Sequence, residues 1–405
     1  MGTDMAHQES VSAGADDSGR ASLIYDPRVR GFVFQALLII VVAGLVWSGL
    51  TNAHDNLQRA GIASGFGFFK ERAGFDIGQS FIHYTNDSTY LRAFFVGLGN
   101  TLVVAVIGIF FATVIGFIVG LARLSKNYLV RKFATVYVET LRNIPLLLQL
   151  LFWYKAVLSI LPSPRAMGIE PGSEIAFSLN NRGLYLPRIV PEAGASLILF
   201  TAIAVLAVWF VLGRWAKKRQ MATGQQFPVF VTGLGLFIVL PLLAFFVTGM
   251  PLSLEYASLQ GFNMVNGWVI QPEFMALLLG LSLYTASFIA EIVRAGILAV
   301  SHGQTEAAYA LGIRPNLTSR LVIVPQAMRV IIPPLTSQYL NLTKNSSLAV
   351  AIGYPDLVSV TGTVLNQTGQ AVEVISITML VYLTLSLLTS AFMNWFNASV
   401  ALVER

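Results

Sequence analysis

Cysteine is absent from this chain of 405 residues, which excludes disulfides, thiolate metal sites and a cysteine nucleophile. The histidines are few and lack the spacing of metal ligands; they are His7, His54, His83 and His302. No Gly-Lys dipeptide occurs, so the phosphate-binding GxxxxGK(S/T) loop is missing. We therefore expect no metal, no cofactor and no catalytic residue in this chain. If ATP powers its activity, the ATPase must be another polypeptide.

Charged residues are also scarce, at 11% of the chain against about a quarter in a typical soluble domain. Hydrophobic residues make up 55%, and the mean hydropathy is +0.68. An apolar soluble core cannot account for so many runs that reach the roughly 20 residues needed to cross a bilayer. The sequence predicts an all-α polytopic membrane protein of about eight transmembrane helices, at about residues 31–50, 94–121, 133–161, 193–212, 228–248, 274–300, 330–360 and 374–398. The seventh is longer than one crossing and polar at Thr343–Leu348, so we expect a broken or re-entrant helix there.

The formal charge of +6 follows membrane topology and does not indicate nucleic-acid binding. Basic clusters at residues 123–132 and 214–219 have no acidic neighbours and end predicted spans, where the positive-inside rule places them. Segment 162–192 carries balanced charge and is expected outside. A cleaved signal peptide is the alternative for the first run, but no cleavage site is evident after it. We expect both termini, and segment 301–327, in the cytoplasm.

Segment 301–327 is polar and moderately basic, and its residues predict two short helices joined by a glycine. Ser301 and Gln304 have the spacing of a capping box, and Gly312 is a natural helix stop. Pro315 suits the first turn of a second helix, which Pro325 is expected to break. One face of that second helix is apolar, through Leu317, Leu321 and Val324.

Ionisable residues inside predicted spans are costly and by default suggest function. Glu139 with Arg142, and Glu291 with Arg294, are each three residues apart, so either pair could form on one helix face. Because both pairs lie near predicted cytoplasmic ends, position alone favours snorkelling and helix packing. Lys344 lies deeper in its span. We expect a buried cation beside hydroxyl groups there, which suits a gate, a pathway or pairing between helices.

Small residues are frequent in the predicted spans and permit close helix approach. Gly116 and Gly120 form a GxxxG pattern. This pattern more often reflects packing inside one chain than a dimer face, so we expect the former.

Segment 301–327 resembles the EAA loop in the inner-membrane permeases of bacterial ABC importers. The matching residues are Glu306-Ala307-Ala308, Gly312 and Ile323-Val324-Pro325. Flanking segments are similar to the polar amino acid branch, the histidine, glutamate, glutamine, arginine and opine permeases; they are Thr285 to Ala308, Glu139 to Phe152 and Leu342 to Leu348. The loop from Asn56 to Gly78 is similar to that of the long permease subunits of general L-amino acid importers.

The resemblance implies a type I ABC importer permease fold, with a five-helix core plus three extra helices. The expected organisation is a disordered cytoplasmic tail (1–30), an extra N-terminal helix and periplasmic loop (31–92), the first part of the core (93–161), periplasmic loops with an inserted helix pair (162–272), and the second part of the core (273–401) with the coupling loop 301–327.

The resemblance also implies a function. The chain would be a non-catalytic permease subunit that translocates L-amino acids across the bacterial inner membrane by alternating access. Its partners would be two ABC ATPase subunits, a second permease that we expect to be a paralogue, and a periplasmic amino acid-binding protein. The chain would lie in a lipid bilayer and would not bind nucleic acid. The expected ATPase-coupling residues are Glu306, Ala307, Ala308, Gly312, Arg314 and Pro325. The expected pathway or gate residues are Arg142, Pro145, Gln149, Glu291, Arg294, Lys344, Ser346 and Ser347.

Two functions from other classes compete with this interpretation. One is an ion-coupled secondary amino acid transporter, in which Lys344 and Glu291 would serve ion coupling. The other is a membrane scaffold without transport. The lack of inverted-repeat broken helices weighs against the first, and the EAA-like loop weighs against both.

Overall fold

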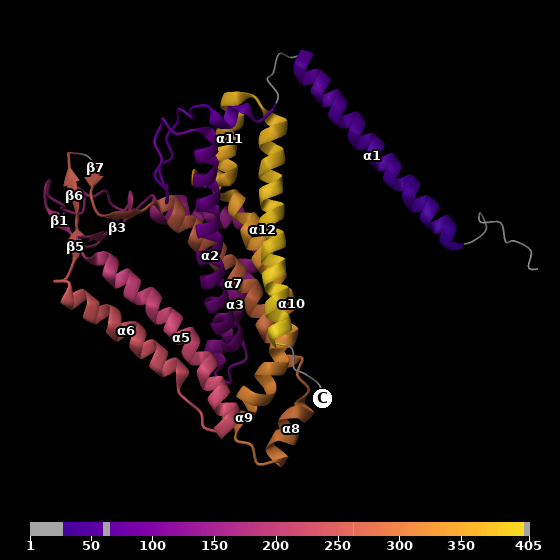
Figure 1. Cartoon of the computed structure of the whole chain (residues 1–405), viewed down its shortest axis with the longest axis vertical. Coiled ribbons are helices and arrows are strands. Elements are labelled where there is room, and N and C mark those ends of the chain that lie inside the picture. Colours follow the sequence, from indigo (N-terminus) through magenta and orange to yellow (C-terminus); the bar gives the residue numbers. More distant parts are fainter. Residues whose placement is uncertain (1–26, 60–64, 262, 401–405) are drawn as a thin grey trace, which may run out of the picture. The chain divides into compact units, whose positions relative to one another are not determined.

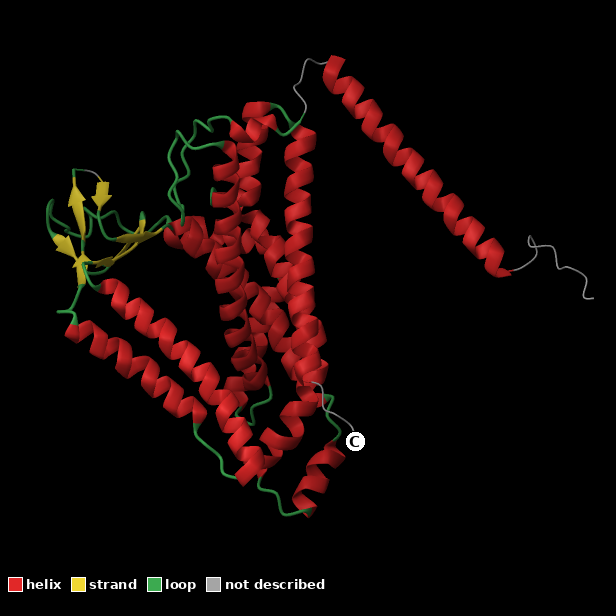
Figure 2. Cartoon of the chain, in the orientation of Figure 1, coloured by secondary structure: helices red, strands yellow, loops and turns green. Residues whose placement is uncertain are grey.

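The computed structural model describes residues 27–59, 65–261 and 263–400. Helices dominate these residues, and short strands occur between residues 174 and 270 (Figure 2). The chain divides into two compact units, Met1–Gly67 with Thr368–Glu373 and the remainder. The disordered tail predicted for residues 1–30 lies, up to residue 26, outside the described residues. In the first unit, helix α1 (Pro27–Arg59) is unbroken, and its large apolar side chains between Phe32 and Trp47 are exposed.

Six described helices are long and apolar enough to cross a membrane. They are α1, α2 (Tyr90–Arg123), α5 (Ala195–Thr223), α6 (Val229–Val247), α7 (Pro272–Leu298) and α12 (Ala371–Val400). A bent pair of helical segments raises the number to seven. Two further described helical segments belong neither to the bent pair nor to the third predicted span. They are η1 (Gly67–Lys70) and α8 (His302–Ala310). The all-α membrane fold is therefore confirmed, with six or seven such helices where about eight are expected.

The difference in the number of spans comes from the third predicted span, residues 133–161, which is not one continuous helix. Helix α3 (Tyr128–Asn143) ends before Pro145, and Ile144 adopts an extended conformation with ψ of 127°. The residue before a proline is pushed into this region by the clash with the proline ring. Helix α4 (Leu146–Leu151) then starts and continues as the π-helix η2 (Phe152–Leu158). The apolar part is too short to cross a bilayer by itself.

The seventh predicted span is broken, as expected, but at a different point. Helical segments run from Pro315 to Ile352: α9 (Pro315–Thr318), η3 (Ser319–Ile323), α10 (Val324–Asn345) and the 3-10 helix η4 (Ser346–Ile352). Helix α11 (Leu357–Thr368) follows, bent from this run by 54°. The polar residues Thr343–Leu348 stay helical, and the chain turns only after Ile352. The prediction that the break lies at the polar stretch is therefore wrong.

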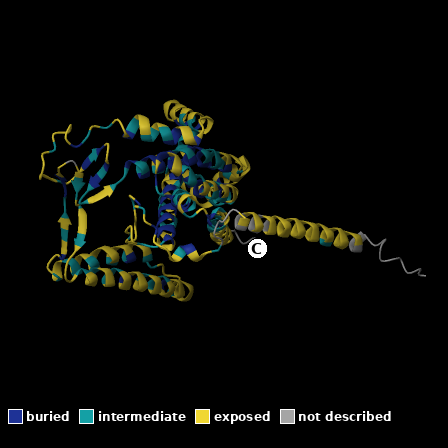
Figure 3. Cartoon of the chain, turned by 90° about the horizontal axis from the view of Figure 1, so that it is seen from above, coloured by how far each residue is buried: buried dark blue, intermediate teal, exposed yellow. Residues whose placement is uncertain are grey.

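The core of the larger unit forms where α2 packs on α7. A Cβ built on Gly116 would lie 2.6 Å from the Ile289 Cβ, and one on Gly120 would lie 2.8 Å from the Ala290 carbonyl oxygen. Only hydrogen fits at such positions, so these glycines permit the close approach. The expected packing inside one chain is confirmed. Burial is concentrated in this bundle, whereas α5 and α6 stay exposed over most of their length (Figure 3).

Between the two parts of the predicted core, α5 and α6 lie side by side with strands at one end of the pair (Figure 1). The strands form three small sheets of order β1-β6-β7, β2-β3-β8 and β4-β5. Their bounds are β1 (Glu174–Ile175), β2 (Ser178–Asn180), β3 (Gly183–Leu186), β4 (Arg188–Pro191), β5 (Leu252–Glu255), β6 (Ala257–Gln260), β7 (Asn263–Val265) and β8 (Trp268–Ile270). All pairings in these sheets are antiparallel, and each sheet joins the segments before and after the helix pair. We call these strands the β module; only loops are predicted there.

The contact between α2 and α7 yields a stability prediction. Gly116→Ala adds a Cβ where the neighbouring backbone and Ile289 leave no room, so we expect destabilisation by about 1–3 kcal/mol. The matched control is Gly99→Ala on the same helix, because a Cβ at Gly99 meets nothing within 4 Å. Thermal unfolding of the purified full-length variants in detergent measures both. Equal unfolding midpoints for the two variants would contradict the packing assignment.

Candidate coupling loop and transport site

The loop between α7 and α10 begins with helix α8, and Gly312 stops that helix. Gly312 has a φ of +73°, a conformation that L side chains rarely adopt. Its N–H donates to the Tyr309 carbonyl at 2.9 Å, and the N–H of Ile313 donates to the Ala308 carbonyl at 3.0 Å. These two bonds form a Schellman motif, which satisfies carbonyls that a helix end otherwise leaves open. The predicted helix stop at Gly312 is confirmed.

The second half of the loop reverses direction and leads into α10. Arg314 is extended, with ψ of 148°, and Pro315 is the first residue of α9, as predicted. The Thr318 side chain is buried and donates to the carbonyls of Ile313 and Arg314, at 3.3 and 3.2 Å. This hydroxyl fixes the turn to the helix that follows it.

Pro325 does not break the helix, contrary to the prediction. A proline cannot donate to the carbonyl four residues earlier and clashes with it. The chain accommodates this by widening into η3 just before the proline, where the Val324 N–H donates to the Ser319 carbonyl five residues earlier. A π-helical turn of this kind lets the helix continue through Pro325 into α10.

The capping box predicted at the start of α8 is wrong. The Ser301 side chain makes no capping bond among the described residues, and the side-chain oxygen of Gln304 instead accepts from Gln326 Nε2 at 3.2 Å. The bond to Gln326 links α8 to α10. Ala308, one of the expected coupling residues, is only 3% exposed in the single chain. Glu306 is exposed, and His302 Nδ1 lies 2.9 Å from its carboxylate.

The loop and the start of the helix that follows it expose large apolar side chains. Five are between 44% and 80% exposed: Tyr309, Leu311, Leu317, Leu321 and Val324. Leu317, Leu321 and Val324 are the apolar face predicted for the second helix. Tyr309 and Leu311 lie outside the helices that could cross a membrane, and large exposed apolar groups in such places are typical of surfaces that bind another protein.

Three arginines from α2, α3 and α7 lie around the carboxylate of Glu291. Glu291 forms ion pairs with Arg294, at 2.8 Å, and with Arg123. The Arg142 guanidinium lies 4.0 Å from the same carboxylate and 5.1 Å from the centre of the Phe288 ring. We call these residues the Glu291 cluster. It confirms the pairing of Glu291 with Arg294.

The predicted pairing of Glu139 with Arg142 is wrong. Glu139 is exposed and makes no ion pair among the residues that the structure describes, because Arg142 turns toward α7. The sequence analysis also missed Arg123 as a partner of Glu291. Its only signal there was a basic residue at a span end, which the positive-inside rule already explained.

Lys344 is exposed in the single chain, so the prediction of a buried cation is wrong. Together with Ser347 it lines a cavity of about 430 Å³, whose other walls are α11 and α12. Tyr382 and Ser386 also line this cavity. Ser346, by contrast, is buried and donates to the Thr343 carbonyl at 2.7 Å, so the structure separates it from Lys344.

Pro145 and Gln149 lie together at the break between α3 and α4. Gln149 is 5% exposed, and its Nε2 donates to the carbonyls of Leu141 and Ile144, at 2.8 and 2.9 Å. These are carbonyls near the end of α3, so the amide supplies the hydrogen bonds that the broken helix lacks. This contact gives Gln149 a structural role at the break.

The fold and the loop define the class of protein: an all-α, multi-pass membrane protein with an ordered two-helix loop before its last membrane segments. The family model for the inner membrane component of binding-protein-dependent transport systems matches residues 214–402. The general L-amino acid transport system permease protein AapQ of Rhizobium johnstonii is 55% identical over 95% of this chain and 95% of its own length.

Two more relatives match along nearly their whole length. The putative amino-acid ABC transporter permease protein YhdX of Escherichia coli is 50% identical over 99% of this chain and 100% of its own length. The glutamate/glutamine/aspartate/asparagine transport system permease protein BztB of Rhodobacter capsulatus is 45% identical over 95% of this chain and 96% of its own length. The chain therefore belongs to the family of amino acid ABC transporter permeases.

The Glu291 cluster yields a second prediction. Glu291→Gln deprives Arg123, whose side chain is 11% exposed, of its carboxylate. In a double-mutant cycle with Arg123→Gln we expect a coupling free energy of roughly 0.5–3 kcal/mol. The value stays below the cost of unpairing a deeply buried ion because the Glu291 side chain is 26% exposed.

The cycle is measured by unfolding of the four purified proteins in detergent. Glu139→Gln is the control, and we expect no change because that side chain is exposed and makes no ion pair among the described residues. Strictly additive effects of the Arg123 and Glu291 substitutions would contradict a stabilising pair.

Proposed function

We propose that this chain is the transmembrane permease subunit of an ATP-driven importer that translocates L-amino acids across the bacterial inner membrane. The observation that carries the proposal is the loop of α8, Gly312 and α9. It is ordered by its own hydrogen bonds, yet it exposes large apolar side chains and contains no group that could bind or hydrolyse ATP. Such a loop can receive motion only from a partner. The names of the full-length relatives support the same function.

The partners follow from this function. Two ATPase subunits bind the coupling loops from the cytoplasm, a periplasmic binding protein delivers the amino acid, and a second permease, a paralogue, completes the pathway. The chain itself is non-catalytic. The dependence on a binding protein is supported by the description of the family model that the chain matches.

In the orientation that we propose, both termini and the coupling loop lie in the cytoplasm. The basic residues at the ends of α2 and α5 support this, since positive charge collects on the cytoplasmic side. Residues 124–127 and 162–192 then lie on opposite sides of the membrane. The segment Tyr128–Leu158, with its break at Pro145, makes that crossing as one unit. The β module lies on the extracytoplasmic side.

In the mechanism, closure of the ATPase dimer moves the coupling loop, and the helices that line the pathway reorient. Ala307, Ala310 and the exposed apolar side chains contact the ATPase, while Glu306 and Arg314 offer charge at the same surface. Gly312 keeps the two short helices at a fixed angle. The Glu291 cluster and Lys344 then act at the pathway, where an ion pair between helices opens or closes as they move.

Reconstitution tests this function directly. Proteoliposomes containing this chain, its paralogue and the ATPase should take up amino acids from a panel only when ATP and the binding protein are both supplied. A proton or sodium gradient without ATP should drive no uptake. Uptake by the permease alone, driven by such a gradient, would instead establish the secondary transporter.

Gly312→Val tests the coupling role. Valine is strained at a φ of +73°, so the Schellman turn should rearrange and uptake should fall at least tenfold, with the protein still inserted in the membrane. Binding-protein addition should no longer stimulate ATP hydrolysis. Gly312→Asn should retain much of the uptake, because asparagine tolerates this conformation.

The matched control is Gly224→Val, between α5 and α6. Gly224 has the same φ of +73° and the same open surroundings, but lies outside the coupling loop. We expect that variant to transport normally. Normal uptake by Gly312→Val would sink the coupling role of the loop, as would equal losses in both valine variants.

A further inference from the structure

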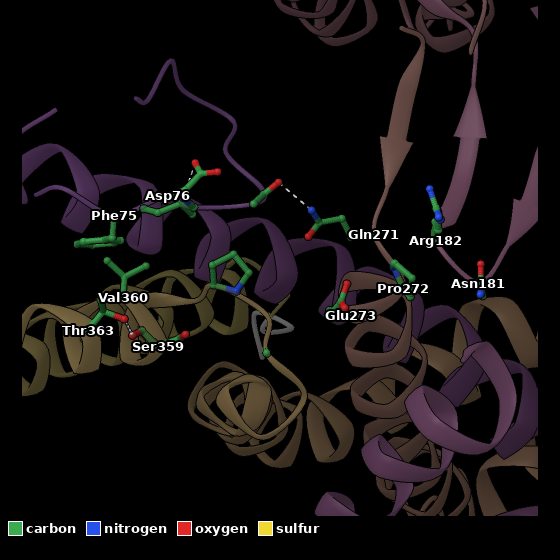
Figure 4. Close-up of a pocket in the computed structure, with 14 residues that line it drawn as sticks. Phe75, Asp76, Asn181, Arg182, Gln271, Pro272, Glu273, Ser359, Val360 and Thr363 are labelled. Carbon is green, nitrogen blue, oxygen red and sulfur yellow. Dashed lines mark hydrogen bonds between the residues drawn. The ribbon is translucent and has the colours of Figure 1, made fainter. Parts of the chain in front are cut away.

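The last turns of α5 gather positive charge. Residues 193–254, which include all of α5 and α6, contain no Asp or Glu, and their cations fall within residues 214–219: Arg214, Lys217, Lys218 and Arg219. We call these four residues the α5 basic cluster. In the pocket of about 410 Å³ beside the start of α7, by contrast, the charged groups have both signs and lie well apart, as Figure 4 shows for Asp76, Arg182 and Glu273.

The length of the helix pair places this cluster at a membrane surface. From Ala195 to Gly213, α5 carries no charge, and this part of the helix is about 28 Å long. Helix α6 has 19 residues and is therefore about as long. Both lengths match the hydrocarbon core of a bilayer, which is about 30 Å thick. The α5 basic cluster then lies in the headgroup region, at the end of the pair away from the β module (Figure 1).

No acidic side chain of the described residues neutralises this cluster. Arg214, Lys217 and Lys218 are exposed, and the cluster forms no ion pair in the part of the chain that the structure describes. Arg219 is half-buried and donates to the neutral Gln225 side chain at 2.8 Å. The charge of the α5 basic cluster is therefore available to an anion outside the chain.

Aromatic rings hold the two arginines of the cluster at the helix surface. The Arg214 guanidinium lies 4.3 Å from the centre of the Phe210 ring. That of Arg219 lies 5.3 Å from the centre of the Trp215 ring, which makes a T-shaped contact with Phe227 of the α5–α6 linker. A guanidinium stacked on a ring keeps N–H donors at its edge, and their fork geometry fits the oxygens of a phosphate. Tryptophan is itself typical of the headgroup region of a membrane.

We propose that the α5 basic cluster binds the headgroups of anionic phospholipids at the cytoplasmic surface of the membrane. Arg214 and Arg219 donate to phosphate oxygens, while the two lysines add charge that favours an anionic headgroup over a zwitterionic one, which carries its own cation. Basic clusters of this size directly beside a membrane-spanning helix favour anionic lipid. The proposal goes beyond the import function and does not depend on it; the cytoplasmic side follows from the proposed orientation.

Local fluorescence quenching measures which lipid lies beside the cluster. Since the chain has no cysteine, Met221→Cys gives a single site for a fluorophore, and Met221 is 85% exposed. The full-length chain is placed in phosphatidylcholine nanodiscs that contain an equal small fraction of either nitroxide-labelled phosphatidylglycerol or nitroxide-labelled phosphatidylcholine. We expect the labelled phosphatidylglycerol to quench about threefold more strongly at low salt. This preference should vanish at about 1 M salt, where the screening length falls to about 3 Å.

Substitutions in the cluster show whether its charge causes the preference. Arg214→Gln, Lys217→Gln and Lys218→Gln together should remove the preference, whereas Lys217→Arg with Lys218→Arg should retain it. Because these side chains are exposed, the unfolding midpoint in phosphatidylcholine should not change in either variant.

The matched control lies beside the other basic segment. A label on Leu129→Cys, at a side chain that is 62% exposed, reports on the exposed cations Lys126, Arg131 and Lys132. The positive-inside rule places both basic segments on one side of the membrane but requires no lipid to be enriched beside either. We expect a preference about half as large or less there, because Glu139 lies about two turns after Lys132 on α3.

The proposal is overturned by equal quenching from the two lipids at low salt, or by a preference that survives the triple substitution. An equal preference at Leu129→Cys would also overturn it, since only the general attraction of a basic membrane face would remain. A further contrary result would be that added ATPase removes the preference and that the triple substitution weakens ATPase binding. The surface would then bind the ATPase instead of lipid.

Discussion

The close contact of α2 with α7 is the constraint on which most of this structure depends. Gly116 and Gly120 bring the two backbones so near that no Cβ would fit between them. The same contact carries Arg123, the last residue of α2, to the carboxylate of Glu291 on α7. A wider spacing would take the Arg123 side chain, which is only 11% exposed, away from the carboxylate with which it pairs. Packing and ion pairing therefore reinforce each other.

The broken helices obey a second constraint, because backbone polar groups exposed by a break need partners inside a membrane. Gln149 supplies them to the end of α3. At the other break, Asp356 Oδ1 accepts from the Ser359 N–H at 2.8 Å and so caps α11, while the Thr101 hydroxyl accepts from the Leu357 N–H at 3.0 Å. Both breaks are thus satisfied by polar side chains that lie within the bundle.

Sequence patterns predicted the features governed by local chemistry. Apolar runs located the long helices, and Gly312 with Pro315 located the turn of the coupling loop, because φ restrictions act on single residues. The β module was missed because its strands are two to four residues long and pair across an intervening helix pair. Arg142 was assigned to Glu139 because sequence spacing reveals neighbours on one helix, whereas α7 offered a partner from elsewhere in the fold.

The second half of segment 301–327 and Lys344, a proposed pathway residue, are joined by one helical run. Every residue from Pro315 to Ile352 is helical, through α9, η3, α10 and η4. The π-helical turn at Ser319–Ile323 is what allows this continuity past Pro325. Under the proposed coupling role, a displacement at α9 would be carried along this run to Lys344 and to the bend before α11. Two helices separated by a flexible loop at Pro325 could not transmit a displacement in this way.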